Sequence, residues 1–229
     1  MGMPSSVTIT AEQLDLAKRL GAIFTPHARK QIDAHYGESG APARFVHYTS
    51  AENALKIIET KSLWMRNATC MSDYREVQHG YDILARFFSV EANRDSFTAA
   101  LDACAPGAAK EAIGHFDNWW SDIRNSTYIT SISEHLSTED AHGSLSMWRA
   151  FGNSAARVGI VVRVPFASGS GLALGIMFSP VAYLTEEQAH GTIGRDVVKN
   201  IEANVGFLKG LDRQAIINYV FTMLLVDQI

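Results

Sequence analysis

The sequence has no cluster of lysine or arginine. Its 229 residues carry 20 Lys and Arg against 24 Asp and Glu, for a net charge of −4, and the basic residues are scattered. A protein that holds nucleic acid through the phosphate backbone needs a basic stripe. The composition therefore argues against such a protein and leaves open only a local basic groove.

The chain also has few groups suited to holding a metal. Its two cysteines, Cys70 and Cys104, form no CxxC motif, and its eight histidines occur without HxxxH, HExxH or Cys–His ligand spacing. Structural and catalytic zinc sites depend on such spacings, so we expect no metal. Two separated cysteines are typical of a reduced intracellular chain.

Long apolar runs are missing as well. The most apolar stretch, 158–178, is interrupted by Arg163 and Pro165, and residues 1–20 lack the apolar core of a secretory signal. A membrane span needs about 20 predominantly apolar residues. We therefore expect a cytoplasmic protein with no membrane partner. The sequence also lacks the lysine of a P-loop, so the glycine-rich stretch does not predict a phosphate-binding loop. It contains no G-x-S-x-G motif, so it does not predict a serine hydrolase.

The stretch 44–76 has the clearest organisation. Residues 44–48 are rich in aromatic and β-branched residues and predict a short strand. Thr49, with Glu52 three residues later, predicts a capping box for a helix that ends near Thr60.

That helix is expected to pack inward, because its apolar residues share one face at helical spacing. These residues are Ala51, Ala54, Leu55 and Ile58. A second short strand is expected to begin at Leu63-Trp64-Met65.

A histidine and a tyrosine, His47 and Tyr48, stand where the first strand ends and the helix begins. Polar side chains and free backbone N–H groups converge at such a junction, which suits a ligand. A His–Tyr pair at a strand end is also a common structural feature. The residues alone leave both interpretations open.

The N-terminal region, 1–40, predicts helices. Thr10 and Gln13 match a capping box, and Pro26 is expected to divide the region in two. The helices expected later in the chain span 74–90, 94–103, 108–121, 144–151 and 193–229. Trp119 and Trp120 are interpreted as core residues of the third of these helices.

Three further stretches predict strands. Residues 127–133 alternate apolar and polar side chains, which is typical of a half-buried strand. Residues 158–164 are apolar on both faces and predict a central strand, and 178–184 predict another. The fold class is therefore α+β, a small mixed or antiparallel sheet with flanking helices, in one domain over 41–229.

The order of several segments resembles a bacterial family catalogued as domain of unknown function 2971. The segments are HYTSAENALKIIETKSLWM, CMSDYREVQHG, YITSISE, SLSMWRAFGN and VGIVVRV, which lie within 44–185. The chain departs from the family's pattern with Ser72 in place of Asn and Phe151 in place of Tyr. The family is similar in layout to the ADP-ribosyltransferase-like superfamily.

This resemblance implies an enzyme that uses NAD as a substrate, either transferring ADP-ribose or cleaving NAD. Breaking the nicotinamide–ribose bond passes through an oxocarbenium-like state, which needs held ribose hydroxyls and stabilised positive charge. His47 would bind a ribose hydroxyl, and Tyr48 or Trp148 would stack the nicotinamide. Thr49, Ser131 and Ser133 would complete the nucleotide site. The acceptor, a protein or nucleic acid or small molecule, stays open.

The carboxylate of such a site has three candidates, Glu76, Glu134 and Glu187, and we assign the catalytic role to Glu76 with His47 and Tyr48. Glu76 and Asp73 also fit simple helix capping at the start of their helix. The family usually carries a C-terminal E-x-E-x-R-like segment that residues up to Ile229 lack. We therefore expect a truncated domain that binds NAD but cleaves it slowly.

Two functions follow as alternatives. The first is an ADP-ribosyltransferase or NAD-cleaving enzyme acting as a bacterial toxin or phage-defence effector. The second is a non-catalytic module of the same fold that binds a nucleotide or a protein partner.

Overall fold

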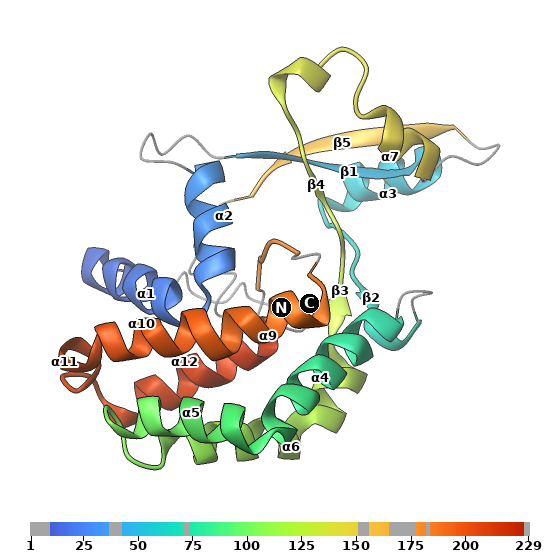
Figure 1. The fold of residues 1–229 in the computed structure, drawn as a ribbon. Coiled ribbons are helices and arrows are strands. Elements are labelled where there is room, and N and C mark those ends of the chain that lie inside the picture. The colour runs from blue at the N-terminus through green and yellow to red at the C-terminus, as the bar shows by residue number, and fades with distance from the viewer. Residues whose placement is uncertain are drawn as a thin grey trace.

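A three-stranded antiparallel sheet lies against a larger body of helices in the computed structural model, seen at the top and bottom of Figure 1. The structure describes residues 10–36, 43–70, 74–150, 156–164, 177–181 and 184–226. The α+β class and the antiparallel sheet with flanking helices are confirmed.

The helical body is built from both ends of the chain and from its middle. Its helices are α1 (Ala11–Phe24), α2 (Pro26–Tyr36), α4 (Tyr74–Ser89), α5 (Glu91–Asp102), α6 (Ala108–Ser126), α9 (Glu186–Gly191), the π-helical η3 (Thr192–Val197), α10 (Val198–Ala203), α11 (Val205–Leu208) and α12 (Arg213–Val226).

Local sequence signals begin and separate these helices as expected. The Thr10 hydroxyl accepts from the Gln13 N–H at 3.1 Å, and the Gln13 side chain accepts from the Thr10 N–H at 2.9 Å. This reciprocal pair is the predicted capping box. Pro26 opens α2, where its missing N–H costs nothing, and so divides the N-terminal region.

The main hydrophobic core lies wholly within the helical body. It contains fully buried side chains from α1, α4, α5, α6, α10 and α12, and Phe87, Phe97 and Leu101 are among the largest. The predicted tryptophan pair is divided by this packing. Trp120 stacks on Tyr81 with ring centroids 4.3 Å apart, whereas Trp119 is 59% exposed, so the core interpretation is wrong for Trp119.

The sheet has the strand order β4–β1–β5, with β1 (Arg44–Ser50) in the middle. All seven residues of β1 pair with β5 (Arg157–Arg163), and Phe45 and Val46 also pair with β4 (Ser133–Glu134). The prediction of a central strand over 158–164 is therefore wrong among the described residues. Most residues of the strand are half-buried and Val161 and Arg163 are exposed, so its apolar pattern does not require a neighbour on each side.

The strand predicted over 127–133 is divided in two. Its first part, β3 (Tyr128–Ile129), pairs with β2 (Arg66–Asn67), and its second part is β4. The chain thus crosses from a two-stranded sheet to the three-stranded sheet. The alternation of apolar and polar residues does not show that the pairing strand changes within this stretch. The second strand expected from Leu63 begins instead at Arg66.

Helix α3 (Ala51–Thr60) follows β1 directly, and its cap is Ser50, not Thr49. The Ser50 hydroxyl accepts from the Asn53 N–H at 3.2 Å. Thr49 is buried and lies one residue before the N-cap, so its hydroxyl does not cap the helix.

The inward face predicted for α3 is wrong in extent. Ala54 is buried, but Leu55 and Ile58 are 61% and 63% exposed. The small sheet covers only a narrow strip of side chains on the helix. The spacing of apolar residues in the sequence does not reveal how wide that contact is.

Shorter elements complete the described fold. They are η1 (Ala68–Cys70), η2 (Ser137–Glu139) and α7 (Leu145–Ala150). The described part of the stretch 178–184 contains no strand. No helix among the described residues combines the length and apolar character needed to cross a membrane.

The separation of the helical core from the sheet generates a stability prediction. Replacing Leu101, which is 0% exposed, by Ala should lower the free energy of unfolding by about 2–5 kcal/mol, because it opens a cavity. The matched change Leu55→Ala on the exposed face of α3 should alter it by about 0.5 kcal/mol or less. Urea unfolding measures both, and equal losses would contradict the burial difference.

Candidate functional site

Strand β1 distributes the predicted site residues over two faces of the sheet. Successive side chains of a strand point to opposite faces. Phe45, His47 and Thr49 therefore lie on one face, and Val46 and Tyr48 lie on the other. We call these the histidine face and the tyrosine face.

On the histidine face, His47 contacts the segment that crosses from β3 to β4. Its Nδ1 lies 3.1 Å from the carbonyl oxygen of Ser131. A carbonyl can only accept, so Nδ1 carries the proton and donates it. In the neutral ring Nε2 is then a hydrogen-bond acceptor, and no described residue bonds to it.

The sequence placed His47, Tyr48 and Ser131 in one site. The backbone carbonyl of Ser131 does contact His47, but Tyr48 points to the opposite face, so the three do not converge. Ser133 serves the opposite face. It pairs with Val46, and its hydroxyl lies 3.7 Å from the sulfur of Met147 on α7.

Glu134 is the described carboxylate that shares a face with His47. It lies directly across from Phe45 in the β1–β4 pair, and residues opposite each other in a ladder point to the same face. Glu134 is therefore diagonal to His47, at the roughly 7–8 Å typical of such neighbours. It is also exposed to solvent.

The other two candidate carboxylates are elsewhere. Glu187 stands in the first turn of α9, in the helical body. Glu76 lies on α4, and its side chain falls outside the described residues, as does Asp73.

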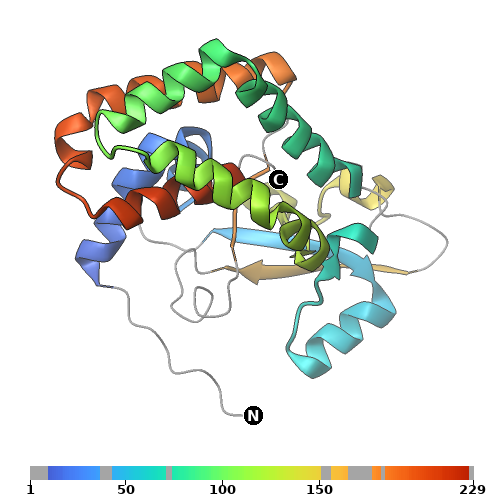
Figure 2. The same cartoon turned by 90° about the horizontal axis from the view of Figure 1, so that it is seen from below.

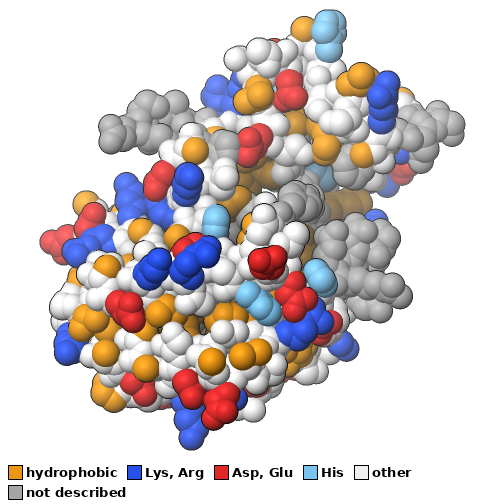
Figure 3. Space-filling model, in the orientation of Figure 1, with side chains coloured by type: hydrophobic (Ala, Val, Ile, Leu, Met, Phe, Trp, Pro, Cys, Tyr) orange, Lys and Arg blue, Asp and Glu red, His pale blue; other side chains and the backbone are white. Residues whose placement is uncertain are grey.

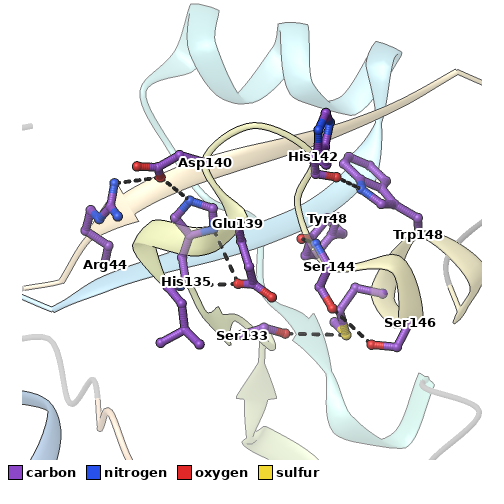
Figure 4. A network of polar contacts seen from close by, with 12 residues as sticks. Arg44, Tyr48, Ser133, His135, Glu139, Asp140, His142, Ser144, Ser146 and Trp148 are labelled. Carbon is purple, nitrogen blue, oxygen red and sulfur yellow. Dashed lines mark hydrogen bonds and ion pairs between the residues drawn. The ribbon is translucent and has the colours of Figure 1, made fainter.

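On the tyrosine face, Tyr48 and Trp148 meet and hold a loop. Their rings are 4.6 Å apart at 86°, in an edge-to-face arrangement. The Tyr48 hydroxyl accepts from the Ser144 N–H at 2.8 Å, and the Trp148 indole donates to the His142 carbonyl at 2.7 Å (Figure 4). Trp148 lies on α7 as predicted, but its ring serves the face opposite His47.

A glycine makes this packing possible. Gly143, between His142 and Ser144, has a φ of 65°, and a Cβ there would come within 2.8 Å of the Trp148 indole nitrogen. Such a contact cannot be tolerated without moving the ring. Tyr48 and Trp148 are therefore structural anchors for the loop from His135 to Ser144.

The other end of the same loop is held by a network of charged and polar side chains that no local sequence pattern predicts. Asp140 accepts from Arg44 at 2.9 Å and from His135 Nε2 at 2.9 Å (Figure 4). The His135 side chain is only 5% exposed, and its Nδ1 lies 3.8 Å from Glu139. Arg44 and Asp140 are 96 residues apart, so no local spacing connects them.

This network shifts the titration of its carboxylate. Hydrogen bonds from Arg44 and then from His135 hold the pKa of Asp140 below its ordinary value. Both bonds favour the charged form.

Two shallow hollows of the described surface lie away from both faces. One is bordered by Asp15, Arg19 and Phe207 on the helical body, and another by Lys110, Glu111 and His115 along α6. Within the described ranges no group of three or more His, Cys, Asp or Glu is placed to hold a metal ion.

Comparison of the chain with protein-family models, with curated proteins and with solved structures finds no match in any of the three. The arguments about function therefore depend on the residues and their geometry.

The loop contact of Tyr48 gives a stability prediction. Tyr48→Phe removes the acceptor of the partly buried Ser144 N–H and should cost about 1 kcal/mol. Tyr128→Phe, at an exposed tyrosine of β3, is the control and should change little. A Tyr48→Phe protein with unchanged thermal stability but lost NAD binding would instead assign Tyr48 to a ligand.

The low pKa of Asp140 predicts a pH dependence. Its folded pKa lies below the unfolded value of about 3.9, so its stabilising contribution is present above that value and is lost as the pH falls through the folded pKa. The stability gap between wild type and Asp140→Asn should be widest at about pH 5–7 and should narrow below about pH 4.

Urea unfolding across that pH range measures the gap. Asp95→Asn, which removes an exposed carboxylate of α5, controls for the loss of one charge. A gap that stays constant down to pH 2 would show that the network does not act through ionisation of Asp140.

Proposed function

We propose that the histidine face binds NAD and cleaves its nicotinamide–ribose bond. The observation that carries this proposal is the bond between His47 Nδ1 and the Ser131 carbonyl. It fixes the ring so that Nε2 accepts, which suits a ribose hydroxyl as donor. The resemblance to ADP-ribosyltransferase-like proteins assigns the same role to a histidine on the first strand.

The chemistry of the bond supplies the rest of the argument. The C–N bond breaks with its electron pair leaving on nicotinamide, so positive charge develops on the ribose. An acceptor nucleophile, or water, then bonds to that carbon and releases its proton. A carboxylate on the same face stabilises the developing charge.

Glu134 is the described carboxylate that fits this role, because it shares the face of His47. Glu76 is a second candidate for the carboxylate. It lies in the first turn of α4, a few residues after β2 in the chain. The acceptor follows from neither residue, and a role as toxin or phage-defence effector rests on the resemblance.

A second function, nucleotide binding without chemistry, is favoured by one observation. Tyr48 and Trp148, the aromatic residues expected to stack nicotinamide, are engaged on the opposite face in holding the loop. Without these two residues, the histidine face can bind a ribose but lacks the aromatic side chain expected to stack on the nicotinamide.

Nicotinamide release distinguishes the two functions. Glu134→Gln should reduce release by about a hundredfold or more, since a carboxylate worth a few kcal/mol acts mainly in the transition state. Binding of NAD, followed by calorimetry, should change much less. His47→Ala should weaken both.

The control is Glu187→Gln, an exposed carboxylate in the first turn of α9, which should retain full release. Equal release by the Glu134→Gln and Glu187→Gln proteins would remove Glu134 from the mechanism. NAD binding by wild type with no release would establish the non-catalytic module.

A further inference from the structure

Trp64 is a large aromatic side chain left exposed to solvent on the stretch that leads from α3 to β2. It is 54% exposed. This exposure distinguishes it from Trp120, which is stacked within the helical body, and from Trp148, which is tied to the loop.

The position of Trp64 follows from strand pairing. Arg66 pairs with Ile129 in the β2–β3 sheet, with the chains antiparallel. Trp64 lies two residues before Arg66 and Ser131 two residues after Ile129, so both stretches continue from the same end of this short strand pair. Ser131 is the residue whose carbonyl accepts from His47.

The arrangement of α3 places this stretch on the side of the histidine face. Figures 1 and 2 show α3 and α7 on opposite sides of the sheet, and the chain from α3 to β2 leaves on the α3 side. Since α7 carries Trp148 on the tyrosine face, the α3 side is that of His47.

A positive charge lies over the same ring. Lys56 Nζ on α3 is 5.9 Å from the ring centroid of Trp64, within reach of a cation–π interaction. Lys56 also pairs with Glu52 at 2.7 Å, which holds its amine near this position.

We propose that Trp64 is the platform on which the adenine ring of the nucleotide stacks. An exposed indole is a favourable stacking surface for any base. The nicotinamide ring of NAD is a pyridinium cation, which the Lys56 ammonium repels, whereas adenine is neutral. The same ammonium attracts the phosphates that follow the adenosine.

This inference deepens the proposed function, on which it rests for the placement of the ligand beside His47. The platform can nevertheless be tested separately from the chemistry, because AMP and ADP-ribose contain adenine but have no nicotinamide–ribose bond to cleave. Binding of these probes tests the platform, and nicotinamide release tests the chemistry.

The experiment compares the affinities of variants for AMP and ADP-ribose by calorimetry. Trp64→Ala should weaken both by about five- to 150-fold, the range for losing one stacked base, and Trp64→Phe should restore part of the loss. Trp119→Ala is the matched control, because Trp119 has a similar exposure of 59% but lies on α6, and it should bind like wild type.

Each result decides the assignment. Losses confined to the Trp64 variants support the platform even if wild type releases no nicotinamide. Equal affinities for the Trp64→Ala and Trp119→Ala proteins, or no binding of either probe by wild type, overturn it. A loss of affinity for nicotinamide mononucleotide without one for AMP overturns the choice of adenine.

Discussion

Seven residue pairs join β1 to β5, and this antiparallel ladder determines where each candidate side chain can point. Because successive residues face opposite ways, His47 and Tyr48 cannot serve one surface although they are adjacent. His47 lies on the face where the chain crosses from β3 to β4, and the tyrosine face receives α7 and the loop from His135 to Ser144. The surface of Figure 3 shows the sheet unit set apart above the helical body.

The orientation of His47 depends in turn on the segment between β3 and β4. That segment is paired at one end to β2 and at the other to β1, so the Ser131 carbonyl between them is held in place. A backbone acceptor fixed in this way selects one tautomer of the imidazole. The hydrogen-bonding character of the histidine face is therefore set by strand pairing and not by a neighbouring side chain.

The sequence predicted the elements whose signals are local. The Thr10 capping box, the break at Pro26 and the helix from Tyr74 all depend on residues within a few positions of one another. The adjacency of His47 and Ser131 followed from two predicted strands in one sheet.

Other features depended on partners distant in the chain, and the sequence could not supply them. The division of 127–133 required knowing that β2 and β1 are separate neighbours. The network of Arg44, His135 and Asp140 joins residues almost a hundred positions apart. The exposure of Leu55 depended on the width of the sheet beneath α3, which no helical periodicity reports.

Among the described residues, the helical core contains none from the sheet, and this division bears on how the protein can change over time. Substitutions on the histidine face alter a surface whose supporting contacts lie in a different set of side chains. Side chains on the sheet can therefore change without disturbing the packing of the helices. A lineage could alter the surface of the sheet while the same helices go on folding unaltered.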